Sequence, residues 1–278
     1  MRALIAEVWH SPSGRIGLVL SALVLGFALL GPLLAIDPNA IDIPAAFAAP
    51  GLTHPFGTDN LGRDLLARSA VGTRSAVLIA VTVVGLSGLA GASLGTLAGL
   101  IGGWTDRAVI VVFDIISAYP PVILAMGLVA LYGKGWTNII VVVTILFIPQ
   151  FGRMARAQTL ALRHQPFVDA ERILGLPGWR LATRHLLPNV AGPLLVLASM
   201  NIPVVVTVEA GLSFLGLGMQ PPVASLGSLI KDGYVYLDKS WWPTITASSI
   251  LALATLGATL LGEALRDATD PKLRGRVP

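Results

Sequence analysis

Long stretches of this chain contain no Asp, Glu, Lys or Arg: residues 16–36, 75–104, 135–152, 185–208 and 240–262. An α-helix rises about 1.5 Å per residue, so roughly 20 apolar residues cross the hydrocarbon core of a bilayer, which is about 30 Å thick. The pattern therefore predicts an all-α polytopic membrane protein. Six transmembrane helices are expected, at about 16–36, 76–102, 108–132, 136–156, 188–213 and 244–263.

Two of these expected helices have features of their own. Residues 16–36 form an apolar run longer than the roughly 7–15 residues of a cleavable signal core, so we expect a retained first helix. The third helix contains Asp114 and the pair Pro120-Pro121. Proline lacks the backbone N–H that a helix needs and clashes with the preceding turn, so this helix should bend or unwind there.

The connections after the first and fifth helices are long. Residues 37–57 are rich in Pro and Ala and predict irregular structure. Thr58 is then expected to cap a helix start with Asp59 in its first turn, and residues 61–74 to form a short amphipathic helix at the outer interface. In the second connection, at about 214–243, the pair Trp241-Trp242 is typical of an interfacial anchor.

Composition and charge favour a membrane location. Hydrophobic residues make up 54% of the 278 residues and charged residues 12%, which is about half the share in a soluble domain. The net charge of +4 would suit nucleic acid, but thirteen of the 19 basic residues lie on one side of the expected topology. The positive-inside rule places that side, with both termini, in the cytoplasm. Membrane lipid, not nucleic acid, is the expected neighbour. The six basic residues on the outer side are Arg63, Arg68, Arg74, Lys134, Lys231 and Lys239.

A strip of small residues and two acids occur within the expected spans. Ser87, Gly91, Gly95 and Gly99 recur at every fourth position, which lets a second helix approach closely. We expect a packing seam against this subunit or a sister subunit; the alternative is a Gly-rich helix without a special partner. Asp114 and Glu209 are candidates for lining a translocation path. In the alternative, Asp114 bonds to a neighbouring helix and Glu209 sits near the outer interface.

The predicted cytoplasmic loop 157–187 contains a short helix with an apolar face. Pro166 suits the first helical position, and Gly175 with its neighbours should end the helix. Phe167, Ala170 and Leu174 share one face. A second short helix, 179–186, is expected to return to the membrane before Pro188 opens the fifth span. Such a ridge suits a groove in a cytosolic partner, although an interfacial amphipathic helix is equally open at this point.

The loop resembles the "EAA" loop of permease subunits in binding-protein-dependent ABC importers, whose pattern is E-A-A-x3-G-x9-I-x-L-P. Asp169 takes the position of Glu, Ala170 that of the first Ala and Gly175 that of Gly. Glu171 and His185 depart from the pattern, since they replace the second Ala and the Ile. Three further segments are similar to the C-type permease of the dipeptide/oligopeptide/nickel branch: residues 54–64, 209–222 and 262–271.

The resemblance implies a type I ABC importer permease fold in a bacterial inner membrane. A homologous second permease would complete the translocation path, two cytosolic ATPases would dock on the loop, and a periplasmic or lipid-anchored binding protein would deliver substrate. This chain would bind no cofactor itself, because ATP and Mg would be held by the ATPases. Glu171 is expected to pair with an arginine of the ATPase or to face solvent. The implied coupling residues are Phe167, Asp169, Ala170, Glu171, Leu174, Gly175 and Arg180.

The substrate implied most directly is a di- or oligopeptide, with nickel chelates, glutathione and opine-like solutes as alternatives. The chain is expected to divide into a cytoplasmic segment at 1–15, the first helix and outer loop at 16–74, the core transmembrane domain at 75–264 and a cytoplasmic tail at 265–278. A stand-alone secondary transporter is disfavoured, because no repeat relates the two halves.

The sequence offers little support for an enzymatic function. No lysine follows the G-x4-G sequence of a phosphate-binding loop, so ATP hydrolysis would need another chain. Ser87 in Gly85-Leu86-Ser87-Gly88 lacks a base at similar depth for a serine protease, because none of the four histidines lies in the middle of a span. No two histidines lie within helical reach for zinc. The absence of cysteine excludes disulfides and thiolate metal sites.

Overall fold

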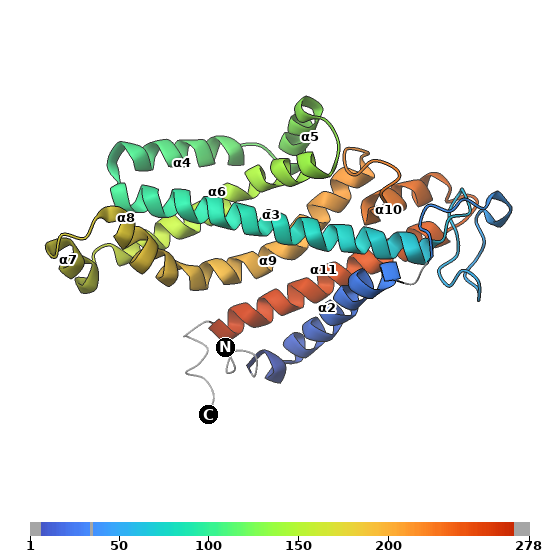
Figure 1. Cartoon of the computed structure of the whole chain (residues 1–278), viewed down its shortest axis with the longest axis horizontal. Helices are drawn as coiled ribbons and strands as arrows, with labels where there is room; N and C mark the ends of the chain where they lie inside the picture. The colour runs from blue at the N-terminus through green and yellow to red at the C-terminus, as the bar shows by residue number, and fades with distance from the viewer. Residues whose placement is uncertain (1–6, 34–35, 270–278) are drawn as a thin grey trace. The chain divides into compact units, whose positions relative to one another are not determined.

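The computed structural model describes residues 7–33 and 36–269, and its named elements are all helices (Figure 1). Within these ranges no β-strand forms, and one isolated bridge joins Thr58 to Asp64. The all-α prediction is confirmed. The expectations for residues 1–6 and 270–278 lie outside the described part. The helices are α2 (Pro12–Leu30), α3 (Leu65–Ile101), α4 (Gly103–Ser117), α5 (Pro121–Tyr132), α6 (Trp136–Leu162), α7 (Pro166–Ile173), α8 (Gly178–Arg180), α9 (Leu187–Phe214), α10 (Leu226–Val235) and α11 (Trp242–Thr269).

Five described helical segments are long and apolar enough to cross a membrane, and a sixth span results if α4 and α5 are counted together. The axes of α4 and α5 differ by 92° across the short break between them. The bend expected at Pro120-Pro121 is therefore confirmed. It follows from the missing proline N–H groups, which cannot continue the hydrogen-bond ladder.

The fifth span begins earlier than the sequence predicts. Helix α8, a π-helical turn (Leu181–Leu186) and α9 follow one another without a break from Gly178 to Phe214. The prediction of a separate helix at 179–186 is therefore wrong. The N–H of Leu187 bonds to the carbonyl of Ala182, so the wide turn ends directly before Pro188. Pro188, which has no N–H, thus lies where the π-helical hydrogen bonds give way to α-helical ones, and the helix continues past this proline.

No separate interfacial helix forms at 61–74, because these residues lead directly into the 37-residue helix α3. Asp64 caps α3 by accepting a hydrogen bond from the N–H of Ala67 at 2.9 Å. Thr58 is not a helix cap. Its hydroxyl accepts from the N–H of Ala48 at 2.8 Å and donates to the carbonyl of Ala45, which fixes the preceding loop. No glycine or proline separates 61–74 from the next apolar run at a point that would stop the helix.

The connection expected at 214–243 contains a helix that the sequence reading missed. Ser225 begins α10 with a capping box: its hydroxyl accepts from the N–H of Ser228, and the Ser228 hydroxyl accepts from the N–H of Ser225. Within α10 itself, Leu226 and Leu229 are buried. The capping serines were a usable signal, but the surrounding glycines and prolines suggested a loop.

The chain forms two compact units, and α3, α5, α6 and α9 contribute residues to both. One comprises 1–81, 126–140 and 199–278, the other 82–125 and 141–198. In the first unit α2 lies alongside α11 (Figure 1). Glycine permits this approach, since a Cβ on Gly17 would lie 2.6 Å from the backbone nitrogen of Leu261.

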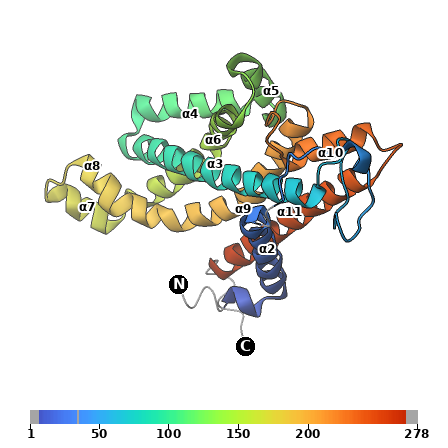
Figure 2. The ribbon, with the colours of Figure 1, turned by 45° about the vertical axis from the view of Figure 1, so that its right-hand side comes forward.

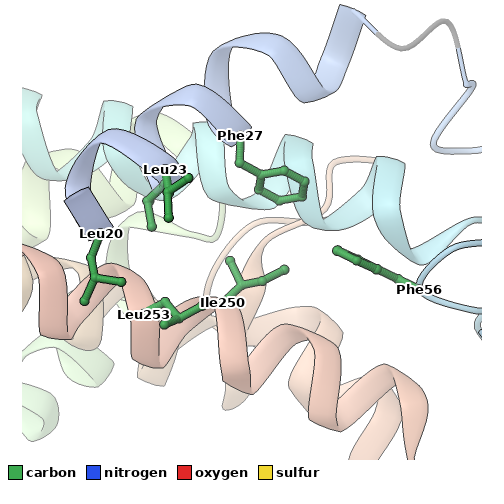
Figure 3. A pocket seen from close by; sticks show the side chains of 7 residues that line it. Leu20, Leu23, Phe27, Phe56, Ile250 and Leu253 are labelled. Carbon is green, nitrogen blue, oxygen red and sulfur yellow. The ribbon is translucent and has the colours of Figure 1, made fainter. Parts of the chain in front are cut away.

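An apolar cavity of about 160 Å³ opens between α2 and α11 (Figure 3). Phe27 of α2 and Phe56 of the following loop lie at one end, with ring centroids 6.2 Å apart. The remaining lining residues, all aliphatic, are Leu20, Leu23, Val24, Ile250 and Leu253. The lining offers no charged group that could hold a polar solute.

Candidate functional site

The second unit contains the short helices α7 and α8, which lie close together (Figure 2). Val168 anchors α7, because its side chain is fully buried against Leu181 and Leu186. Leu100 and Leu162 pack against the same cluster. Burial of this apolar base fixes α7 to the ends of α3 and α6 and determines which of its faces stays free.

The ends of α7 lie where the sequence predicts them. The helix begins at Pro166 and ends at Ile173. Gly175 follows with a backbone φ of +76°, the left-handed conformation that favours glycine. The N–H of Leu174 bonds to the carbonyl of Ala170 at 3.0 Å, and the N–H of Leu176 to that of Glu171 at 3.1 Å. Gly175 therefore reverses the chain while the last carbonyls of the helix remain bonded.

The free side of this region is an apolar ridge, which we define as Phe167, Ala170, Ile173, Leu174 and Trp179. The structure leaves all five exposed, with Ile173 at 86% and Leu174 at 77%. Sequence reasoning identified Phe167, Ala170 and Leu174 but missed Ile173 and Trp179. Ile173 follows Ala170 by three residues, so its helical spacing could have revealed it.

A cation borders the ridge. The guanidinium of Arg180 lies 5.2 Å from the ring centroid of Trp179, within the range of a cation–π contact. The backbone of Asp169 lies in α7, whereas its side chain is outside the described part of the structure.

The two departures from the EAA pattern contact each other. Glu171 Oε1 lies 2.8 Å from Nδ1 of His185, which joins α7 to the π-helical turn. The Glu171 side chain is only 17% exposed. The expectation that Glu171 faces solvent is therefore wrong, because His185 already contacts its carboxylate. The alternative, pairing with an arginine of the ATPase, stays a prediction. The fourteen-residue separation gave no local sign of this pairing.

The strip of small residues in α3 lies against α6 within the second unit. A Cβ on Gly91 would lie 2.6 Å from Cβ of Phe151, and one on Gly95 would collide with the carbonyl oxygen of Gly152. A Cβ on Gly99 would lie 3.0 Å from Thr159. Ser87 at the start of the strip is fully buried, and its hydroxyl donates to the carbonyl of Val83 at 2.7 Å. These glycines bring the two backbones together.

Two ion pairs join α4 to α6. Arg156 bonds to both carboxylate oxygens of Asp106, with its Nη2 at 2.7 Å from Oδ2. Asp114 accepts from Nη2 of Arg153 at 2.9 Å. In the first pair the side chains are mostly buried, with Asp106 19% and Arg156 29% exposed. In the second pair they are more exposed, with Asp114 at 62% and Arg153 at 43%. Asp114 thus has a partner on a neighbouring helix and still presents a polar surface.

Glu209 has a different environment. It lies in α9, is fully buried, and accepts a hydrogen bond from the Ser213 hydroxyl at 2.7 Å. Its Oε2 has no hydrogen-bond partner among the described residues. Because the chain itself encloses this carboxylate, the geometry favours a role in packing over one in lining a path.

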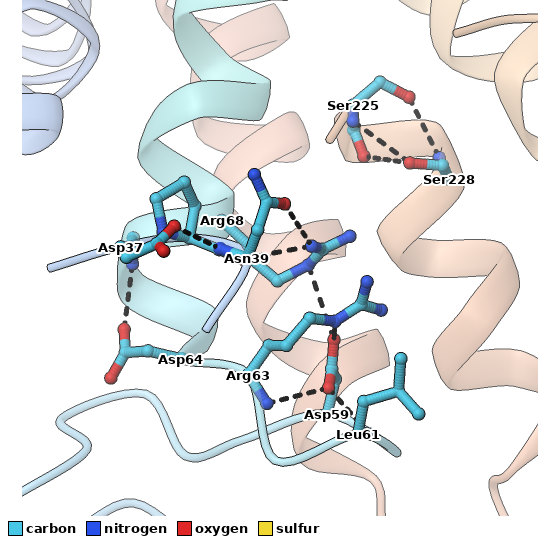
Figure 4. A network of polar contacts seen from close by, with 11 residues as sticks. Asp37, Asn39, Asp59, Leu61, Arg63, Asp64, Arg68, Ser225 and Ser228 are labelled. Carbon is cyan, nitrogen blue, oxygen red and sulfur yellow. Dashed lines mark hydrogen bonds and ion pairs between the residues drawn. The ribbon is translucent and has the colours of Figure 1, made fainter. Parts of the chain in front are cut away.

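The loop before α3 is fixed by a charge network in the first unit (Figure 4). Asp59 bonds to Nε of Arg63 at 2.7 Å and lies 3.4 Å from Nε of Arg68. Asp64 pairs with Nδ1 of His54 at 2.9 Å. In the nearby helix α10, burial raises the pKa of Asp232, and the charge of Arg68 opposes this shift. The network stabilises the loop before α3. Its described His, Asp and Glu residues form no cluster suited to a metal ion.

The fold defines a polytopic membrane protein, and α7 presents an exposed apolar ridge. Residues 91–275 match the family described as the binding-protein-dependent transport system inner membrane component. The chain belongs to this family and is a multi-pass inner-membrane permease component of an ABC importer.

Three known proteins illustrate the relationship. An oligopeptide transport system permease protein of Mycobacterium bovis is 38% identical over 263 residues, covering 92% of this chain and 89% of that protein. A glutathione transport system permease protein of Pectobacterium atrosepticum is 36% identical over 236 residues, covering 85% and 78%. A chain of the inward-facing methionine ABC transporter MetNI shares the fold, with a TM-score of 0.51 and 20% identity over 70% of this chain and 94% of that chain.

Proposed function

We propose that this chain forms half of the translocation path of an ATP-driven peptide importer and that its apolar ridge docks on a cytosolic ATPase. The observation that carries this proposal is that α7 has one buried apolar side and one exposed apolar side. Val168 is fully buried, whereas Leu174 is 77% exposed. A helix fixed at its base and apolar at its free face can transmit a push from a partner into α6 and α9.

The proposed assembly contains a homologous second permease, two ATPases that hold ATP and Mg, and an extracytoplasmic binding protein. Both termini and α7 face the cytoplasm in this arrangement, in agreement with the distribution of basic residues. Closure of the ATPases on ATP would move the docking helices together and turn the path outward.

Peptides are the proposed substrates because relatives of this chain carry that function in their names. The oligopeptide permease is 38% identical, and glutathione, named for the second relative, is itself a small peptide. Mass spectrometry of the ligand retained by the cognate binding protein tests this point. Peptides are expected; a nickel chelate or an opine-like compound would contradict the peptide assignment.

Docking can be tested with single cysteines, since the chain has none of its own. A thiol-attached photo-cross-linker on Leu174→Cys should capture the ATPase in the assembled importer. Thr183→Cys is the matched control, because Thr183 is also exposed in this region but lies outside the ridge. Capture from position 183 alone, or transport by the purified chain without ATPases, would refute the proposal.

A further inference from the structure

A cavity of about 280 Å³ lies in the first unit, at the N-terminal end of α11. Its lining residues are Phe47, Lys239, Ser240, Trp241, Trp242 and Ile245. Pockets that enclose a whole small ligand measure about 300–1,000 Å³, so a cavity of this size suits one end of a larger molecule. The lining combines apolar walls, most of them aromatic, with one cation and one hydroxyl.

The cation of this cavity is held by aromatic rings. Nζ of Lys239 lies 5.9 Å from the ring centroid of Phe47 and 5.7 Å from that of Tyr236, within the range of cation–π contacts. The two ring centroids are themselves 5.4 Å apart. Within the described part of the chain, no Asp or Glu lines the cavity. An anionic ligand would therefore find a positioned cation there, whereas a cationic ligand would find no carboxylate.

Ser240 adds a hydroxyl that the protein itself leaves unused. The residue is 7% exposed, and its Oγ has no hydrogen-bond partner among the described residues. Buried polar atoms are nearly always bonded, and an unpaired one lowers stability. Because Ser240 lines the cavity, rotation of its side chain about χ1 would let the hydroxyl donate to an anion there.

The cavity lies where a helix of membrane-spanning length begins. Trp242 is the first residue of α11, and the helix dipole places a partial positive charge at this end. The 28 residues of α11 extend about 42 Å, close to the roughly 40–45 Å of a bilayer with its headgroups. Tryptophan is enriched at the level of the headgroups, and both Trp241 and Trp242 line the cavity. Its position and charge match the region of the lipid phosphates.

We propose that this cavity binds the headgroup of a phospholipid with a net negative charge, such as phosphatidylglycerol. The phosphate would accept hydrogen bonds from Lys239 and Ser240, and the glycerol backbone and first methylenes would contact the tryptophan rings. A zwitterionic headgroup would bind less well, because its ammonium would meet Lys239 without a carboxylate to offset the repulsion. The site is independent of the transported solute.

The test uses the purified importer in detergent, titrated with short-chain phosphatidylglycerol, and native mass spectrometry counts the lipids that stay bound. Lys239→Gln should raise the apparent Kd about tenfold, the effect of losing a charge-assisted hydrogen bond. Lys134→Gln is the matched control, because Lys134 is also exposed and lies between α5 and α6, outside the cavity. Equal affinities of these two variants would overturn the site.

Ser240→Ala separates lipid binding from a structural role. Without added lipid, the variant should be at least as stable as the wild-type protein, since it removes an unpaired buried hydroxyl. With phosphatidylglycerol, its gain in Tm should be smaller than that of the wild-type protein, because one donor to the phosphate is missing. An equal gain in Tm would show that the hydroxyl does not contact the lipid and would contradict the proposed binding mode.

Two other ligands test the assignment to a lipid of negative charge. Phosphatidylethanolamine should bind the wild-type importer about fivefold more weakly than phosphatidylglycerol; equal affinity would overturn the preference for negative charge. Inorganic phosphate should not displace the lipid, because it cannot make the apolar contacts, and displacement at equal concentration would overturn the lipid assignment. All these readouts measure lipid binding without ATP, so their failure would leave the proposed transport function standing.

Discussion

Replacing His185 with Ile should weaken the attachment of α7 more than replacing Glu171 with Ala. The pair has a 2.8 Å contact, with His185 30% and Glu171 17% exposed. Fully exposed ion pairs contribute about 0–1 kcal/mol and hydrogen bonds to charged groups about 1.5–3 kcal/mol, so a coupling of about 1 kcal/mol is expected here.

The asymmetry follows from what each substitution leaves behind. His185→Ile leaves a mostly buried carboxylate whose Oε2 already has no partner among the described residues. Such a group adds a desolvation cost of about 1–3 kcal/mol. Glu171→Ala leaves only a partly hydrated imidazole. The double variant Glu171→Ala/His185→Ile restores the Ala and Ile of the EAA pattern and should be close to the wild-type protein, since an apolar contact replaces the ionic one.

Hydrogen exchange of the Leu174 and Leu176 amides measures this effect, because both amides close the end of α7. A change of about 1.4 kcal/mol in the opening free energy alters exchange about tenfold. His185→Ile should therefore accelerate exchange at least about tenfold and Glu171→Ala about fivefold or less, while the double variant returns toward the wild-type rate. Exchange in the double variant as fast as in His185→Ile would show that the two side chains are not coupled.

Three other substitutions have matched controls. Gly175→Ala should destabilise the turn by about 1–2 kcal/mol and uncouple uptake from ATP hydrolysis, since its φ is +76°; Gly178→Ala, equally free of neighbours but without a positive φ, should retain coupling. Gly95→Ala should lower the free energy of unfolding, measured by thermal unfolding, by about 1–3 kcal/mol, because the added Cβ would collide with the backbone of α6. Gly85→Ala places its Cβ in open space and should be neutral or stabilising. Asp64→Ala should lower the free energy of unfolding by about 1–2 kcal/mol through loss of the α3 cap, and Asp64→Asn, which still caps, should lower it less. In each of the three pairs, an equal loss in the substitution and its control would refute the stated cause.

The parts of the fold that the sequence predicts are those set by local chemistry. Uncharged runs located the spans, Pro120-Pro121 located the bend, and Pro166 with Gly175 bounded α7. Each signal acts through neighbouring backbone atoms or through the cost of placing charge in lipid. Such effects depend little on the rest of the fold.

The features that were missed depend on contacts between distant residues. The amphipathic pattern at 61–74 suggested a separate interfacial helix, but α3 buries Arg68 within it, and Asp59 lies 3.4 Å from the Nε of this arginine. Helix α10 is short, and its stability comes from burial of Leu226 and Leu229. Neither effect is visible in a local hydrophobic pattern, because the partner or the covering surface is supplied by another part of the chain.

The Glu171–His185 pair joins the two positions at which the chain departs from the EAA pattern. The proposed docking mechanism requires that α7 move as one body with α6 and α9, and it does not require that the contact be apolar. Val168 supplies the apolar part of the anchor, while the ion pair joins α7 to the turn leading into α9. Since both charges lie on the inner side, they leave the apolar ridge unchanged. Glu171 and His185 therefore act together in the anchor of α7 and lie apart from the apolar ridge, which is the proposed docking surface.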